Sequence, residues 1–314
     1  MSLYTHLSIQ DIENILSTFY TIQNVQEVIL LKGGSENTNY LVKTQEFSFV
    51  LTLCEQKTVA EAERLASLLQ YLNDNDFKTS EVIHTSQGDL ITTFKNKPII
   101  LKSFIEGIIT EDLSNDQLEE LGKKLAHLHQ IKAPDYITDT LNFGVKYFDK
   151  VKVYAAGSDF DKWLTQIKLD VSKTFSDKLP KALIHSDIFS SNIIVNTAAN
   201  STTIMDFEEA CYYYRVFDIG MMIVGTCSAN NEISLSKATH ILKGYQKITP
   251  LLTIEKEALQ MSIVYAAAAT SYWRHQNFNY VKPNPKRKDD YIEMQRLADF
   301  ARAIPKDVFN TIFN

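Results

Sequence analysis

Four polar residues in the second half of the chain have the spacing of a phosphoryl-transfer site. His185, Asp187 and Asn192 form the pattern H-x-D-x-x-x-x-N, and Asp206 follows at the end of a short apolar run. In such sites one carboxylate orients the hydroxyl nucleophile, while an amide oxygen and a second carboxylate hold Mg²⁺ on the nucleotide phosphates. The residue types therefore predict that Asp187 acts on the nucleophile and that Asn192 and Asp206 bind the metal.

The apolar segments on either side of this pattern favour the functional interpretation. The runs Ala182–Ile184 and Ile193–Val195 confine the polar residues to a loop between two buried segments. The pattern alone is loose, and its alternative is an ordinary polar turn with a capping aspartate. We interpret His185 as a brace for the backbone beside Asp187 and not as a proton carrier.

Asp218 and two further histidines have mainly structural interpretations. Asp218 is expected to cap a helix that begins near Phe217 and, if it is buried, to accept backbone hydrogen bonds from the catalytic loop. His127 and His129 lie at the end of a leucine-rich helix, where packing and capping are their expected roles. No cluster of histidine and cysteine predicts a zinc site.

A segment with two adjacent glycines, between two predicted strands, is the candidate phosphate loop. Glycine lets backbone N–H groups approach phosphate closely, although most such turns are purely structural. The segment lacks the pattern G-x-x-x-x-G-K-[ST], which disfavours a P-loop fold. The candidate nucleotide-binding residues of this loop are Lys32, Gly33, Gly34, Ser35, Asn37 and Thr38.

The order of the expected elements predicts an α+β fold. The first hundred residues are strand-rich with one inserted helix, and the rest is mainly helical, so we expect domains at 1–105 and 106–314. Alternating apolar residues predict strands at Val25–Leu31, Thr38–Thr44, Phe47–Leu53, Asp89–Phe94, Pro98–Phe104, Ile193–Val195 and Thr202–Met205. Helical spacing predicts helices at Ser8–Tyr20, Val59–Leu72, Ser114–Gln130, Tyr147–Val153, Phe160–Phe175, Phe217–Thr226, Ile233–Ile248, Ile254–Gln276 and Asp289–Arg302.

Composition limits the class of protein and of partner. The 314 residues carry a formal net charge of -6 with a pI of about 5.7, which argues against a nucleic-acid or anionic-membrane partner. Three scattered cysteines suit a reducing compartment. No basic segment followed by an apolar one opens the chain, and no apolar stretch reaches the roughly 20 residues of a membrane span. We expect a cytoplasmic protein without membrane insertion.

These motifs resemble the phosphotransferase superfamily of aminoglycoside phosphotransferases, choline/ethanolamine kinases and type II homoserine kinases. Within it the chain is most similar to type II homoserine kinases. The resemblance covers nearly the whole chain and lies in Gly34–Tyr40, Val50–Leu53, Lys97-Pro98, Phe104–Gly107, Ile184–Asn192, Gly244–Lys247 and Pro250-Leu251. It implies a protein-kinase-like two-lobed fold with a strand-rich first lobe and a helical second lobe.

The resemblance also implies ATP and Mg²⁺ as cofactors and a small hydroxylated amine or amino acid as acceptor. The hinge near Lys102–Glu106 would read adenine through the backbone of Ser103, Phe104 and Ile105. Where protein kinases carry a phosphate-binding lysine in the third strand, this chain has Thr52. Lys32 or backbone N–H groups are candidate replacements, and Glu61 or Glu63 would be the acidic partner that has lost its lysine.

The acceptor is the point on which the motifs disagree. The segment from Asp206 to Gly220 is more similar to choline/ethanolamine kinases, whereas the rest favours homoserine. Choline requires an aromatic cage with a nearby acid, and homoserine requires an acidic and a cationic group. The candidate acceptor-binding residues are Asp187, Glu208, Tyr213, Arg215, Trp273 and Arg274. A nucleotide-binding pseudokinase is the remaining alternative, suggested by Thr52.

Overall fold

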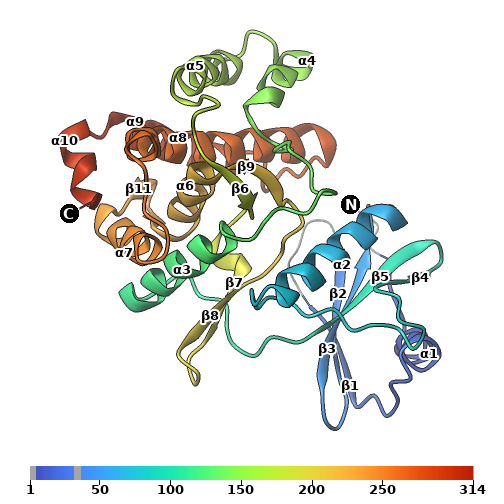
Figure 1. Cartoon of the computed structure of the whole chain (residues 1–314). Helices are drawn as coiled ribbons and strands as arrows, with labels where there is room; N and C mark the ends of the chain where they lie inside the picture. The colour runs from blue at the N-terminus through green and yellow to red at the C-terminus, as the bar shows by residue number, and fades with distance from the viewer. Residues whose placement is uncertain (1–4, 32–36, 314) are drawn as a thin grey trace. The chain divides into compact units, whose positions relative to one another are not determined.

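The computed structural model describes residues 5–31 and 37–313, and the chain divides into two compact units. The first unit comprises Met1–Glu106 together with Met205–Glu208, and the second comprises Gly107–Ile204 and Glu209–Asn314. Strands dominate the first unit and helices the second (Figure 1). The predicted α+β class is therefore confirmed.

The first unit is built on a five-stranded antiparallel sheet in the order β1-β2-β3-β5-β4. Its strands are β1 (Glu27–Leu30), β2 (Asn37–Lys43), β3 (Ser48–Cys54), β4 (Thr92–Phe94) and β5 (Lys97–Ser103). Alternate residues such as Tyr40, Leu51 and Leu101 point to one face and form a core with helix α1 (Ile9–Phe19). The period of two in these strands is what places one apolar row against that helix.

The opposite face of the sheet is more polar toward the start of β2. Asn37 pairs with Cys54 and Asn39 pairs with Thr52, so these four side chains share that face. Helix α2 (Val59–Asp74) follows β3 and contacts β5. The sequence places uncharged polar side chains where a buried sheet would ordinarily be apolar.

The second unit is a helical body with three short antiparallel strand pairs. Helix α8 contacts both α6 and α9 along its length (Figure 1). The helices are α3 (Asn115–Leu128), α4 (Val151–Ala155), α5 (Asp159–Thr174), α6 (Arg215–Thr226), α7 (Leu235–Gln246), α8 (Thr253–Gln276), α9 (Asp290–Ala303) and α10 (Lys306–Phe309), with 3₁₀ helices at Val145–Lys150, Ser190–Asn192 and Asn310–Phe313 and a π-helical turn at Asn277–Val281. The strand pairs are β6 (Lys181–Ile184) with β9 (Cys211–Tyr214), β7 (Ile193–Asn196) with β8 (Ser201–Ile204), and β10 (Ser228–Ala229) with β11 (Glu232–Ile233).

Helix starts match the expected capping residues in two places and differ in a third. Ser8 caps α1, and Ser114 forms a capping box with Gln117 at the start of α3, as predicted. The prediction that Asp218 caps its helix is wrong. Helix α6 begins at Arg215, so Asp218 lies inside the first turn, fully buried, where its carboxylate serves other groups.

No helix in the described residues is long and apolar enough to cross a bilayer.

Two glycines let helices α3 and α7 pack with their backbones almost in contact. A Cβ atom built on Gly122 would come within 2.0 Å of the carbonyl oxygen of Ile241, and one on Gly244 within 1.9 Å of that of Glu119. Neither carbonyl is a flexible group that could move aside. This crossing holds α3, which carries His129 at its end, against the rest of the unit.

We expect Gly244→Ala to destabilise the protein although alanine is the better helix former. Overpacking costs about 1–3 kcal/mol, which exceeds the propensity gain of up to about 1 kcal/mol. Urea denaturation followed by tryptophan fluorescence measures the change. Ser236→Ala, at an exposed position of the same helix, is the matched control and should stay within about 0.5 kcal/mol of the parent. A Gly244→Ala protein as stable as the parent would contradict this packing.

Candidate active site

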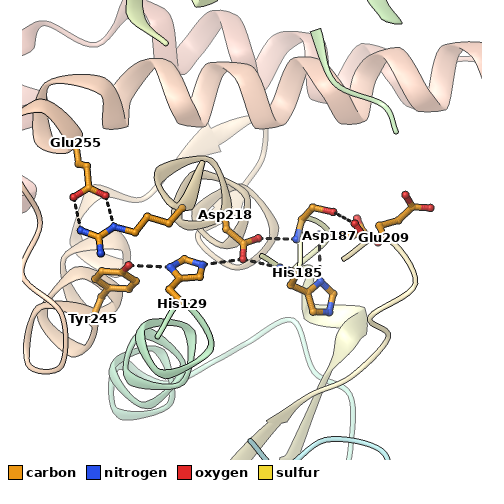
Figure 2. A network of polar contacts seen from close by, with 9 residues as sticks. His129, His185, Asp187, Glu209, Asp218, Tyr245 and Glu255 are labelled. Carbon is orange, nitrogen blue, oxygen red and sulfur yellow. Dashed lines mark hydrogen bonds and ion pairs between the residues drawn. The ribbon is translucent and has the colours of Figure 1, made fainter. Parts of the chain in front are cut away.

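The catalytic loop leaves strand β6 at Ile184 and is held by one buried carboxylate. Asp218 Oδ2 accepts the backbone N–H of His185 at 2.8 Å, and Oδ1 accepts that of Ser186 at 2.7 Å (Figure 2). Asp218 and His185 are fully buried. The expectation that a buried Asp218 fixes this loop through backbone hydrogen bonds is confirmed.

Asp218 is itself supported by a short chain of buried groups. His129 Nε2 lies 3.1 Å from Asp218 Oδ2, and His129 Nδ1 lies 2.8 Å from the hydroxyl of Tyr245 (Figure 2). Burial raises the pKa of Tyr245, so its hydroxyl stays protonated and donates to Nδ1. The tautomer of His129 that carries a proton on Nε2 donates it to Asp218, and every member of the chain then has a partner.

The loop residues beyond Ser186 are fixed by local hydrogen bonds. Asp187 N–H donates to His185 Nδ1 at 3.2 Å, which confirms the bracing role expected of His185. Ser186 has a φ of +70°, a strained value for a residue with a side chain, and its hydroxyl donates to the Glu209 carbonyl at 2.7 Å. The strain is offset by bonds on both sides of the residue, so the backbone presents Asp187 in one conformation.

Asn192 is oriented by Asp187. Its Nδ2 donates to the Asp187 carbonyl oxygen at 2.8 Å and lies 3.3 Å from the Asp187 carboxylate. An amide carries its oxygen and nitrogen on opposite sides, so Oδ1 of Asn192 points away from Asp187. That oxygen is a suitable donor to a hard cation such as Mg²⁺.

The surroundings of Asp187 act on its charge in opposite directions. Burial raises the pKa of Asp187 above its ordinary value, while His185, the Asn192 amide and the Arg274 guanidinium act to lower it. Arg274 is therefore close enough to influence this carboxylate. The combination of a low-dielectric surrounding and a nearby cation is typical of a functional carboxylate.

Helix α6 packs directly beneath the catalytic loop. A Cβ atom on Gly225 would lie 2.1 Å from the carbonyl oxygen of Ile188, and Ile188 is fully buried. The same helix carries Asp218 in its first turn. One rigid element thus supplies both the carboxylate that holds the loop and the surface on which the loop rests.

The segment with Asp206 belongs to the first unit. Asp206 follows β8, is exposed, and has a φ of +70°. Two residues later, one oxygen of Glu208 accepts from the Asn37 amide and the other lies 2.9 Å from Lys57 Nζ. Within the described residues, no three His, Cys, Asp or Glu side chains are grouped to hold a metal ion. Mg²⁺ sites commonly use one or two carboxylates and complete their shell with water and phosphate.

The predicted nucleotide residues have several different environments. Lys32, Gly33, Gly34 and Ser35 lie outside the described residues. The hydroxyl of buried Thr38 donates to Glu55 at 2.7 Å, and Glu55 also pairs with Lys97.

The hinge also uses part of its backbone for the fold. The N–H of Ser103 donates to Glu81, and that of Phe104 donates to Ser48. Ser103 and Phe104 therefore have only their carbonyl groups left for the predicted contact with adenine. Ile105 is the next residue of the predicted hinge.

Two predicted acceptor residues are already paired inside the protein. Arg215 forms a bidentate ion pair with the fully buried Glu255, both contacts being 2.6 Å long. Breaking this pair would leave Glu255 charged and buried without a partner. Glu208 is held by Asn37 and Lys57. In the structure, therefore, the charges of Arg215 and Glu208 both have counter-ions within the protein.

The remaining acceptor candidates are placed differently. Arg274 bonds Glu293 at 2.7 Å and the Asp290 carbonyl at 3.1 Å. Trp273, partly buried, packs edge-on against Phe278. In the tyrosine run Tyr212–Tyr214, Tyr213 lines a pocket of about 240 Å³, and its hydroxyl lies 3.2 Å from that of Tyr265.

The Tyr213 pocket combines both signs of charge. Its lining residues are Asp139, Thr140, Leu141, Gly144, Lys146, Tyr213 and Tyr265. The segment that lines it reaches the catalytic loop through Asn142, whose amide donates to Glu209 at 3.1 Å, and Glu209 in turn holds Ser186. The pocket is large enough for a small polar molecule.

Sequence reasoning missed Lys57, Glu255, Asn142 and the pocket residues Asp139 and Lys146. Of these residues, only Lys57 could have been suspected from the sequence. The helix dipole disfavours a cation directly before a helix N-cap, so a lysine there suggests a further role. The partners of the others are distant in sequence, and no local pattern joins them.

Comparison with known proteins supports one family. The model of the phosphotransferase enzyme family matches residues 27–245. A homoserine kinase of Paramagnetospirillum magneticum is 26% identical over 97% of this chain and 97% of its own length. Among solved structures, a microcompartment-associated aminopropanol kinase aligns with a TM-score of 0.73 at 17% identity, over 97% of this chain and 100% of the other. A spectinomycin phosphotransferase in complex with ADP and spectinomycin aligns with a TM-score of 0.68 at 18% identity and 98% coverage of each chain.

We expect Asp218→Asn to weaken the fold around the catalytic loop. The amide keeps one acceptor oxygen but turns an NH₂ group toward a backbone N–H, and a buried donor left unsatisfied costs about 1–3 kcal/mol. Urea denaturation measures the loss, with the exposed Asp177→Asn as the matched control. An Asp218→Asn protein of unchanged stability would mean that these two hydrogen bonds do not support the loop.

Proposed function

Because the chain belongs to the phosphotransferase enzyme family, we propose that it is an ATP-dependent kinase that phosphorylates the hydroxyl of a small molecule, with homoserine as the acceptor. The observation that carries this proposal is the fixed catalytic loop, in which Asn192 is bonded to Asp187, Asp187 to His185 and the backbone of His185 to Asp218. A loop held this firmly can orient a hydroxyl before reaction, and positioning supplies most of the catalysis in phosphoryl transfer.

Asp187 is assigned to the acceptor hydroxyl. Its carboxylate accepts or orients the hydroxyl proton as the oxygen attacks the terminal phosphorus of ATP and ADP leaves. The Arg274 guanidinium, like His185 and Asn192, lowers the pKa of Asp187 because it favours the charged form of the carboxylate. Burial acts more strongly in the opposite direction and raises the pKa of Asp187, which makes its carboxylate a stronger base toward the hydroxyl proton.

Mg²⁺ would be held by Asn192 Oδ1 and Asp206. The donor set fits the ion, because an amide oxygen directed away from Asp187 and an exposed carboxylate are both hard ligands. When bound, the ion offsets the negative charge of the phosphates. The ADP complex of the spectinomycin phosphotransferase supports a nucleotide cofactor for the same fold.

Homoserine is favoured as the acceptor by the full-length similarity to a homoserine kinase and by the charges beside the loop. A zwitterionic amino acid needs an acid and a cation. Arg274, and the Asp139 and Lys146 side chains of the Tyr213 pocket, provide both signs. Arg274 is preferred to Arg215 for this purpose, because the Glu293 partner of Arg274 is exposed whereas the Glu255 partner of Arg215 is fully buried.

Choline, ethanolamine or a related amino alcohol is the second candidate. Tyr213 and Tyr265 in a pocket with Asp139 are the observation in its favour, because aromatic faces with a nearby acid suit an ammonium group. The aminopropanol kinase with the same fold supports this class of acceptor. A pseudokinase is disfavoured, because several buried hydrogen bonds of the loop serve to orient Asp187.

The test of the proposed activity is phosphoryl transfer from labelled ATP with Mg²⁺ to homoserine, compared for the parent and Asp187→Asn. Turnover should fall by about 10²–10⁴-fold, the usual contribution of a positioned base. Calorimetry should give an ATP affinity close to the parental value, since the substitution keeps the size of the side chain. Near-parental turnover in the folded variant would remove Asp187 from its assigned role.

Competition among homoserine, choline and ethanolamine decides the acceptor. If Arg274 binds the homoserine carboxylate, Arg274→Ala should raise the homoserine KM by roughly 10- to 100-fold, the equivalent of a hydrogen bond between charged groups. Ethanolamine, which has no carboxylate, should lose little. Arg302→Ala, which removes another arginine–carboxylate pair of the second unit, is the matched control. Faster use of choline by the parent would replace homoserine with the amino-alcohol class.

A further inference from the structure

The third strand of the sheet lacks the positive charge that a nucleotide triphosphate requires. Thr52 is 2% exposed, and its hydroxyl donates to Asn39 at 2.7 Å, so this position is occupied by a neutral buried pair. Kinases of this general design balance the phosphates with a lysine that an acidic residue holds in place. Under the function proposed above, another cation must supply that charge.

Glu61, the acidic residue expected on the following helix, is used for a different purpose. Its carboxylate accepts from the N–H and the hydroxyl of Thr58, both at 2.8 Å, in the capping box that begins α2. The hydrogen bond from the Thr58 backbone is the largest cause of its lowered pKa. Glu61 therefore stabilises the start of α2, so a phosphate-binding lysine needs another counter-ion.

Lys57 has such a counter-ion in Glu208. Lys57 stands directly before the N-cap Thr58, where the positive end of the helix dipole disfavours a cation. Its ammonium nevertheless lies 2.9 Å from Glu208, and the two side chains are only 17% and 16% exposed. An ordinary surface ion pair contributes little to stability. Forming a partly desolvated pair against the helix dipole requires more desolvation free energy than that.

The pair lies on the face of the sheet that carries Thr52. The second oxygen of Glu208 accepts from Asn37, and Asn37 pairs with Cys54 two residues along from the Asn39–Thr52 pair. Two residues of strand correspond to about 7 Å. Asn37 begins β2, directly after the predicted phosphate loop, and its Oδ1 is buried without a hydrogen bond in the described residues. Glu208, two residues after Asp206, therefore joins the Lys57 ammonium to the Asn37 amide at the start of β2.

We propose that Lys57, anchored by Glu208, is the phosphate-binding cation of this kinase. It takes the place of the third-strand lysine from the segment between β3 and α2, where Glu208 joins it to Asn37 at the start of β2. Glu208 is its positioning residue, in the role that a helix glutamate has where the lysine is on the strand. This inference rests on the proposed nucleotide-dependent function and adds the group that binds the phosphates.

Calorimetry with two nucleotide probes separates a phosphate-binding role from a structural one. Lys57→Met should weaken MgATP binding by about ten-fold or more, because a hydrogen bond between charged groups is lost, while adenosine, which has no phosphate, should bind within about two-fold of the parent. Lys57→Arg keeps the charge and should retain most of the MgATP affinity. Lys43→Met removes an exposed ion pair with Glu27 in the same sheet and should leave both affinities unchanged.

A second variant guards against loss of folding. Glu208→Gln keeps Lys57 but removes its anchor, and it should weaken MgATP selectively and by less than Lys57→Met does. Thermal melting of each unliganded variant reports whether it is folded. Equal losses for MgATP and adenosine, or no loss for either, would overturn the assignment of Lys57 while leaving the kinase proposal intact. A parent protein that binds no MgATP would overturn both.

Discussion

The buried carboxylate of Asp218 is the interaction on which the catalytic loop depends. The loop leaves β6 with two consecutive N–H groups that no strand can bond and with Ser186 at a positive φ. Left alone, each buried donor would cost about 1–3 kcal/mol, and the strained residue would add a similar amount. Asp218 satisfies both donors from a helix that also packs under the loop through Gly225. His129 bonds Asp218 and is itself bonded by Tyr245, so the loop geometry is tied to the helical core.

Local patterns predicted most of the fold because the helices and the first sheet are amphipathic. The leucines of α3 and the alternating residues of β2 and β3 each point to one face, and burial of that face decides the element. The tyrosine run Tyr212–Tyr214 gave no such signal, and no strand is predicted there. In the structure it is the strand β9, paired with β6, and Tyr213 lines the pocket described above. Four residues show too few alternations of side chains for a strand to be recognised before its partner is known.

The candidate site was predictable where its residues lie close in sequence and not where they depend on distant partners. Asp187 and Asn192, whose spacing predicts the site, are joined by a hydrogen bond in the structure. The charged residues near the aromatic run looked equally available for a substrate, yet Arg215 is neutralised by Glu255, 40 positions away. Sequence can identify a charge, but it does not reveal which charges are already compensated within the fold.

The pairing of Glu208 with Lys57 has a consequence for how metal and phosphate binding are coupled. Glu208 is two residues from Asp206, the proposed metal ligand, so one short segment positions both a metal-binding carboxylate and the partner of the phosphate-binding cation. Asp206 has a positive φ, which leaves its backbone little freedom to adjust independently. A shift of this segment would therefore move the metal site and the Lys57 ammonium together. The neutral Thr52–Asn39 pair is compatible with this arrangement, because it leaves the interior of the sheet uncharged while the cation follows the end of β3.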